Sequence, residues 1–156
     1  MMRPGLIALL PVLALAGCAL FEEAGSPPDT PAGEDGAEAA AAAPAPPPAA
    51  RTADEFDTTT PAQRAAATAV PVRGGEARLG TAVVSLGPPA EPGLWLRTAL
   101  VTTPTPGRVE IAATGRSVAL ELRPAGGSGG GEISLAAMRL LEVPLTSLPE
   151  VVIYRR

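Results

Sequence analysis

A long stretch rich in alanine and proline limits what this chain can fold into. It runs from Ala19 to about Asp57 and includes the segment AAAAAPAPPPAA at positions 39–50. Aromatic and β-branched residues are sparse in it, so it offers too little apolar area to offset the entropy lost on ordering. Its prolines favour a semi-extended spacer. We therefore expect a disordered Ala/Pro/acidic tether over residues 18–57 and a small fold built from the residues after it.

The charge of the chain changes at the same boundary. Residues 19–58 carry nine carboxylates against one arginine, whereas residues 59–156 carry ten arginines against seven glutamates. The simplest interpretation is solvation of the tether and ordinary scatter of charge on the domain. The alternative is a basic face that contacts an anionic wall polymer or a lipid headgroup. Nucleic acid is not an expected partner, because no basic cluster with interleaved aromatic residues is present.

Several residue types that carry enzyme chemistry are missing. The chain has no histidine, all 12 of its basic residues are arginine, and it has one cysteine. These absences remove the commonest general base and metal ligand, the lysine amine of Schiff-base and P-loop chemistry, and any internal disulfide or thiolate zinc site. The sequence therefore predicts no catalytic residue, no metal site and no cofactor, and it favours a protein that is not an enzyme.

The first 17 residues form a pattern of their own, which we interpret as a signal peptide. Arg3 precedes an apolar run from Leu6 to Ala16. This run is too short for a membrane-spanning helix, which needs about 20 residues, but it has the length of the hydrophobic region of a signal peptide. The alternatives are an ordinary secretory signal that happens to be followed by a cysteine, or an anchor that is not cleaved.

The residues Leu15-Ala16-Gly17-Cys18 that end this segment resemble the lipobox of bacterial lipoproteins. The resemblance implies cleavage between Gly17 and Cys18 and the attachment of fatty acyl chains, such as palmitate, to Cys18. Two or more chains hold a protein durably at a bilayer. Ala19, where an Asp would favour the inner membrane, implies the periplasmic face of the outer membrane.

After the tether, the pattern predicts a short helix over residues 58–69 and a small β-rich domain over residues 70–156. Thr60, with proline next and Gln63 three residues on, is typical of a helix N-terminus. Strands are expected at 77–86, 94–102, 107–112, 117–123 and 151–154. The glycine-rich residues 126–131 are expected to form a flexible connector, because they lack the Lys and Ser/Thr of a P-loop. Ser134 is expected to cap a helix that ends at Pro144.

Three segments carry a second resemblance: TGRSVALEL at 114–122, EISLAAMRLLEV at 132–143 and VVIYR at 151–155. They resemble the double-psi β-barrel of rare lipoprotein A and related wall-lytic proteins, which implies a mainly β fold with short helices. The catalytic pattern of that family does not carry over. Pro124 stands where the family has its acidic residue, and Ser134 replaces the Asp that caps the barrel helix. Glu110 and Glu121 lie at alternating polar positions and are expected to be solvated.

The whole chain is also similar to short lipoproteins of alphaproteobacteria of unknown function, some of which carry the label galactarate dehydratase. That activity needs metal or base residues beside a carboxylate, and this chain does not supply them. We expect a lipid-anchored envelope lipoprotein whose non-catalytic β domain binds peptidoglycan or an envelope protein. The alternatives are a degenerate wall-lytic transglycosylase-like enzyme and a structural assembly subunit.

Overall fold

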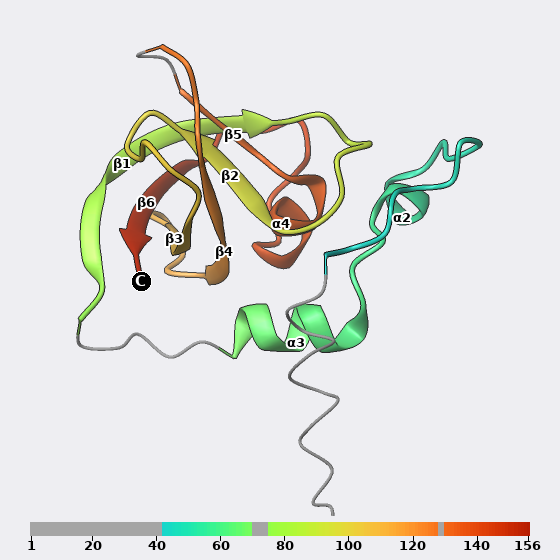
Figure 1. The fold of residues 1–156 in the computed structure, drawn as a ribbon, viewed down its shortest axis with the longest axis horizontal. Coiled ribbons are helices and arrows are strands. Elements are labelled where there is room, and N and C mark those ends of the chain that lie inside the picture. The colour runs from blue at the N-terminus through green and yellow to red at the C-terminus, as the bar shows by residue number, and fades with distance from the viewer. Residues whose placement is uncertain (1–41, 70–74, 128–129) are drawn as a thin grey trace, which may run out of the picture. The chain divides into compact units, whose positions relative to one another are not determined.

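The protein forms a six-stranded β-barrel with short helices beside it (Figure 1). The computed structural model describes residues 42–69, 75–127 and 130–156. In chain order the elements of this part are α2 (Ala53–Phe56), α3 (Pro61–Thr68), β1 (Ala77–Leu86), β2 (Trp95–Thr98), β3 (Thr105–Ile111), β4 (Ser117–Pro124), β5 (Gly131–Ile133), α4 (Leu135–Leu140) and β6 (Glu150–Arg155). The expectation of a mainly β domain with short helices is confirmed.

The barrel closes in the order β1-β5-β2-β4-β3-β6. Two pairs of strands are parallel, β1 with β5 and β2 with β4, and the other pairs are antiparallel. Exchanging β1, β2 and β3 for β4, β5 and β6 leaves this set of pairs unchanged. The two halves of the barrel are therefore related by a topological two-fold symmetry.

The barrel interior is filled by aliphatic side chains. In β4, Val118, Leu120 and Leu122 are buried and alternate with half-buried residues, as the sequence predicts. Val109 and Ile111 of β3 are also both buried, on the predicted shared face. Closure gives every strand two hydrogen-bonded neighbours, so the small barrel has no open edge strand.

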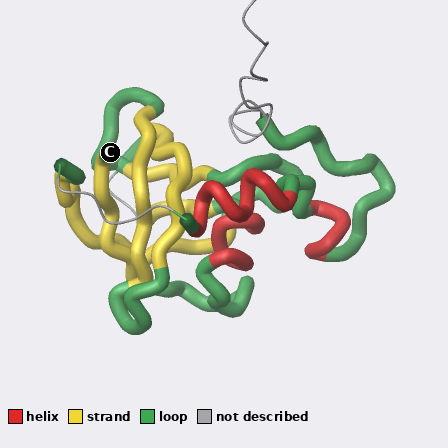
Figure 2. The backbone as a smooth tube through the Cα atoms, turned by 90° about the horizontal axis from the view of Figure 1, so that it is seen from below, coloured by secondary structure: helices red, strands yellow, loops and turns green. Residues whose placement is uncertain are grey.

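The helices lie together on one side of the barrel (Figure 2). In α3 the Thr60 side chain accepts a bond from the Gln63 backbone and the Gln63 side chain accepts one from the Thr60 backbone, which confirms the predicted capping box. Ser134 caps α4, also as predicted. That helix ends before Pro144, in a Schellman arrangement in which Glu142 adopts a left-handed φ of 54°.

Two strands differ substantially from the sequence prediction, whereas the bounds of β3, β4 and β6 shift by one or two residues. β5 was expected to be part of a loop and a helix, because three residues that begin with glycine carry no strand signal. Its Gly131 is required by packing, since a Cβ there would lie 2.9 Å from the Arg97 carbonyl oxygen. β2 ends at Thr98 instead of residue 102, because the Thr98 hydroxyl accepts a bond from the Leu100 backbone and closes a turn.

The predicted tether is ordered in its last part. Residues 42–57 lie within the described structure, where Ala43 and Ala50 are buried and α2 is closed by a capping box between Thr52 and Glu55. The expectation of disorder as far as Asp57 is therefore wrong for these residues. Their composition is poor in apolar area, but the barrel supplies the surface against which they pack. We call residues 42–69 the arm; the remainder of the predicted tether lies outside the described residues.

Candidate functional site

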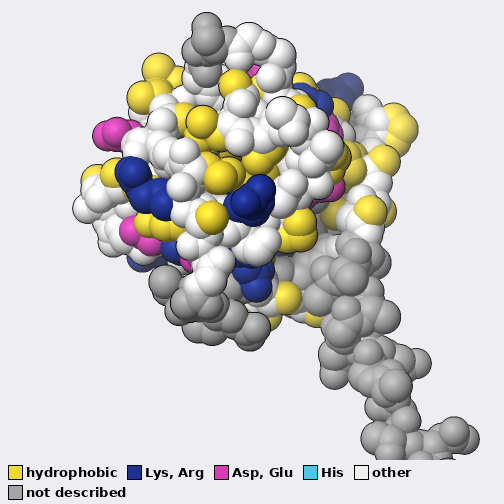
Figure 3. All heavy atoms as spheres, turned by 60° about the vertical axis from the view of Figure 1, so that its left-hand side comes forward, with side chains coloured by type: hydrophobic (Ala, Val, Ile, Leu, Met, Phe, Trp, Pro, Cys, Tyr) yellow, Lys and Arg dark blue, Asp and Glu magenta, His cyan; other side chains and the backbone are white. Residues whose placement is uncertain are grey.

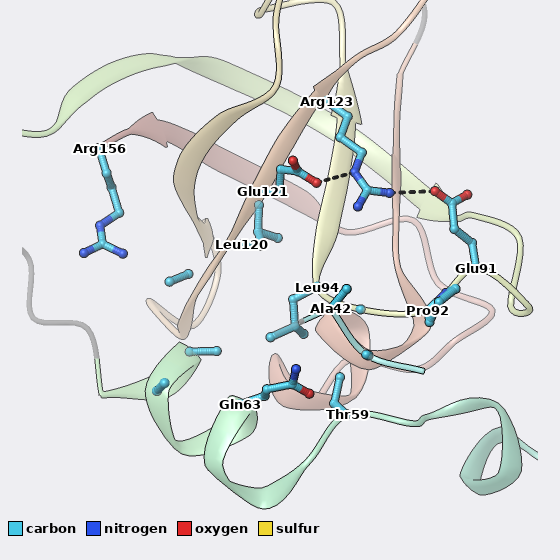
Figure 4. A pocket seen from close by; sticks show the side chains of 15 residues that line it. Ala42, Thr59, Gln63, Glu91, Pro92, Leu94, Leu120, Glu121, Arg123 and Arg156 are labelled. Atoms are coloured by element: carbon cyan, nitrogen blue, oxygen red, sulfur yellow. Dashed lines mark hydrogen bonds and ion pairs between the residues drawn. The ribbon is translucent and has the colours of Figure 1, made fainter. Parts of the chain in front are cut away.

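A pocket of about 670 Å³ lies between the arm and the barrel (Figure 4). This volume falls in the range of small-molecule and cofactor sites. The arm and the barrel each supply one wall. The lining residues are Ala42, Ala43, Thr59, Gln63, Ala66 and Ala67 from the arm, and Glu91, Pro92, Gly93, Leu94, Ala119, Leu120, Glu121, Arg123 and Arg156 from the barrel.

The pocket has an apolar middle and a charged end. Leu94 and Leu120 line the middle, facing the alanines of α3. At the charged end, Arg123 lies between two carboxylates, as Figure 4 shows. Its Nε contacts a Glu121 carboxylate oxygen at 2.5 Å, and its Nη1 contacts a Glu91 carboxylate oxygen at 2.7 Å. Arg156 lines the pocket away from this end. The lining side chains therefore carry two positive and two negative charges, so the pocket is neutral overall.

The charged end is fixed by packing on the outside of the barrel. Glu91 also binds Arg97 at 2.7 Å, so one carboxylate bridges two guanidinium groups. Both guanidinium groups lie against the ring of Trp95, at 4.8 Å for Arg97 and 5.6 Å for Arg123. Trp95 itself is fully buried. Pairing of β2 with β4 sets Arg97 next to Arg123 and Trp95 next to Glu121, which places these side chains on one face.

A second charged cluster surrounds Arg108, whose side chain is only 1% exposed. Its Nε lies 2.9 Å from a Glu76 carboxylate oxygen and its Nη1 lies 2.7 Å from one of Glu110, while the guanidinium carbon lies 4.0 Å from the centre of the Tyr154 ring. Burial acts to lower the pKa of Arg108, but hydrogen bonds and charge from Glu110 and Glu76 outweigh it and raise the pKa above the usual value. Arg108 therefore stays charged across the physiological range.

The buried Glu76 connects this cluster to the pocket. One of its carboxylate oxygens, Oε1, is buried and has no hydrogen-bond partner in the described structure. Arg156, which lines the pocket, lies 3.8 Å from that oxygen. The expectation that Glu110 is solvated is not met, because its side chain is only 28% exposed and its carboxylate pairs with Arg108. Glu121 is more exposed but also paired.

The structure does not bring Glu110 and Glu121 into one site. Glu110 belongs to the Arg108 cluster, whereas Glu121 lines the pocket. Pro124 is the exposed last residue of β4, and the buried Ser134 caps α4 and also accepts a bond from the Trp95 backbone. The predicted lipid-attachment residue Cys18 and the cleavage position at Gly17 lie outside the described residues.

Glu91 and Arg123 were not predicted as site residues. Glu91 follows Gly87-Pro88-Pro89 in a connection without a regular pattern, and Arg123 ends a strand. They lie 32 positions apart and meet only because β2 and β4 are neighbours. No short sequence pattern could therefore have predicted that Glu91 and Arg123 pair.

Most arginines in the described part of the domain are paired with carboxylates. Arginines of the described chain that form ion pairs with carboxylates are Arg97, Arg108, Arg116, Arg123, Arg139 and Arg156. On the face shown in Figure 3, basic side chains are scattered among apolar ones. The simpler interpretation of the charge pattern is therefore favoured.

Within residues 42–69, 75–127 and 130–156, no group of three or more His, Cys, Asp or Glu side chains could hold a metal ion. In the same ranges, no helix has the length and apolar character needed to cross a membrane. Comparison of the chain with protein-family models, with curated proteins and with solved structures finds no match.

Proposed function

We propose that the chain is an envelope lipoprotein, anchored through lipid on Cys18 at the periplasmic face of the outer membrane, and that its barrel is a non-catalytic binding module for peptidoglycan. The observation that carries the binding role is the pocket, which combines an apolar middle with a neutral, ion-paired end. Peptidoglycan offers matching chemistry: hydroxyl and amide groups for the charged end, and methyl groups for the alanine and leucine walls. The barrel is further proposed to be of the double-psi type, which its two symmetry-related parallel pairs support.

A matched pair of variants tests the role of the pocket. Ala66 lines the pocket from an exposed position on α3, whereas its exposed neighbour Ala65 does not line it. Ala66→Trp should fill the cavity with little effect on the fold, and Ala65→Trp adds the same side chain elsewhere. The assay is retention of the full-length Cys18→Ser chain on purified peptidoglycan sacculi. Because the indole occupies the cavity between the arm and the barrel, we expect the retention of Ala66→Trp to differ from that of Ala65→Trp by about tenfold, a difference of about 1.4 kcal/mol in binding free energy. Equal retention of the two variants would refute the pocket as the binding site.

The lipid anchor has its own test. Mass spectrometry of the protein extracted from membranes should find a chain that begins at Cys18 and carries fatty acyl groups. Cys18→Ser should abolish both the modification and the membrane association. An unmodified Cys18 in the membrane-extracted protein would refute the anchor and leave the pocket proposal standing.

A wall-lytic activity is the second candidate, because Glu91 and Glu121 lie together at one end of the pocket. Glycoside cleavage uses a pair of carboxyl groups, one of which must deliver a proton. Here both carboxylates bind the same guanidinium, an arrangement suited to holding a polar ligand. Release of muropeptides by the purified protein, lost in Glu91→Gln or Glu121→Gln, would favour the lytic function over the binding function.

A further inference from the structure

The arm covers a face of the barrel that a wall polymer would need to reach. Helix α3 packs against β4, and the arm supplies six of the residues that line the pocket. Ala119, Leu120 and Glu121 of β4 form the opposite wall. A continuous polymer has no free end that could thread between two walls. It can lie along this face of the barrel only where the arm moves aside.

The arm buries smaller apolar side chains than the barrel does. Its buried apolar residues are Ala43, Ala50 and Ala67, each with a single methyl group. The barrel buries Val, Leu, Ile and Met side chains and one Trp. Because stabilisation by burial scales with apolar area, the arm is a unit of lower stability than the barrel it covers.

One arginine of the barrel helix holds the arm in place. Arg139 of α4 reaches back to the turn around α2, more than 80 positions earlier in the chain. Its Nη1 lies 3.1 Å from the Asp57 carboxylate and 3.3 Å from the Ala53 carbonyl oxygen, and its Nη2 binds the Asp54 carboxylate. Asp57 is only 5% exposed, whereas Asp54 is 83% exposed. An ion pair exposed to water contributes little to stability. The buried contact with Asp57 therefore provides most of the stabilisation that Arg139 gives to the arm; we call the contacts of Arg139 with Asp57, Asp54 and Ala53 the latch.

Asp57 also organises the arm beyond the latch. Its carboxylate accepts bonds from the backbone and the hydroxyl of Thr59, which is itself buried and lines the pocket. Thr60 next to it caps α3. Arg139, Asp57, Thr59 and α3 thus form one connected path from the barrel helix to the wall of the pocket. Loss of the Arg139 contact is therefore expected to loosen the whole arm side of the pocket, including α3.

We propose that the arm is a displaceable, autoinhibitory cover over the ligand-binding face of the barrel, and that Arg139 is its latch. This inference rests on the proposed function for the identity of the ligand, but the motion itself does not depend on it. In the closed state the face formed by Leu94, Ala119 and Leu120 is covered. In the open state it becomes a groove along β4 that accepts a polymer.

The motion is tested without ligand by hydrogen exchange and mass spectrometry on the full-length Cys18→Ser chain. Arg139→Gln removes the latch, and Asp57→Asn removes its main partner while keeping the shape of the side chain. Arg116→Gln is the matched control, because it removes the exposed ion pair with Glu142 outside the arm. We expect amides of α3 to exchange at least about tenfold faster in both latch variants, with amides of β2 and β6 unchanged. The control should leave all of these rates unchanged.

Unchanged exchange in α3 of both latch variants would overturn the proposal. So would equal acceleration in α3, β2 and β6, because the arm would then open only when the barrel unfolds. Either outcome leaves the pocket proposal intact.

Sacculus retention then connects the motion to the ligand. Because the apparent affinity rises with the fraction of open protein, the latch variants should be retained more strongly than the control. Faster exchange in α3 with weaker retention would show that the arm moves but that its closed form is the binding form, which overturns the autoinhibitory role. If neither the variants nor the Cys18→Ser chain without further substitutions were retained on sacculi, the proposed function would instead be overturned.

Discussion

The buried arginine Arg108 gives the sharpest test of how the barrel is held together. Arg108→Leu fills the site with an apolar side chain, leaves Glu110 without its cation, and leaves the Glu76 side chain, only 6% exposed, with the more distant Arg156 at 3.8 Å. Two charge-assisted hydrogen bonds, at 2.9 and 2.7 Å, and the contact with Tyr154 are lost. Removing one partner of a buried ion pair costs about 3–5 kcal/mol. A small domain is stable by about 5–15 kcal/mol, so the variant should retain only part of its stability.

The assay is unfolding in urea, followed by the fluorescence of the single, fully buried Trp95. With a slope of about 1–1.5 kcal/mol per molar for a small domain, a loss of about 3–5 kcal/mol should lower the urea midpoint by about 2–5 M. Arg155→Leu is the matched control: Arg155 lies on β6, is exposed and forms no ion pair in the described structure. Its effect should stay within about 0.5 kcal/mol.

A double-mutant cycle separates the ion pair from simple packing. Glu76→Gln should destabilise the original chain, because it weakens the bond to Arg108. In the Arg108→Leu background the same change should stabilise, by about 1 kcal/mol, because it removes a buried charge that has lost its hydrogen-bonded cation. An equal loss in both backgrounds would refute the coupling. If Arg108→Leu lowered the free energy of unfolding by less than about 1 kcal/mol, Glu76 and Glu110 would not be compensating the cost of burying the Arg108 charge, and the reasoning would be refuted.

Three further changes test local features of the fold. Gly107→Ala should destabilise the barrel by about 1–3 kcal/mol, because its Cβ would lie 2.4 Å from Leu122; Gly126→Ala, with open space around it, should change stability by less than about 1 kcal/mol, and equal urea midpoints would contradict this. Ser134→Ala should cost about 1–2 kcal/mol, since its hydroxyl accepts bonds from the backbones of α4 and β2; an unchanged thermal midpoint would count against the cap. The pKa of Glu55 is lowered by backbone bonds from residues 51 and 52 and by the Thr52 hydroxyl, so the α2 turn is supported above the ordinary value of 4.5 and loses that support as the pH falls through the lowered pKa. Faster amide exchange at residues 51–55 in acid would show this, and Glu55→Gln should remove the dependence.

Features carried by three to ten consecutive residues were predictable from the sequence. The capping box at Thr60, the cap at Ser134 and the alternation in β4 were expected and are present. The bounds of β1 were predicted as they are observed. Each depends on neighbours along the chain, because helix caps join residues three apart and strands repeat every two residues.

The boundary between tether and fold was predicted less well. Composition argued for disorder to Asp57, and the arm from residue 42 is ordered instead. A segment that is poor in apolar residues cannot fold alone, but it can pack on a surface that another part of the chain supplies. Arg139 provides that anchor from 82 positions away, and no local pattern reports such a contact.

The sequence by itself determined that a helix and a set of strands follow an Ala/Pro-rich segment, and it limited the chemistry available through the residue types it lacks. The tertiary structure alone decided the order of the strands in the barrel, the presence of the short strand β5 and the pairing of Glu91 with Arg123 at the pocket. It also decided the burial of Arg108. These features depend on residues that lie far apart in the chain and meet only when the barrel closes, so their energies belong to contacts that no short segment contains.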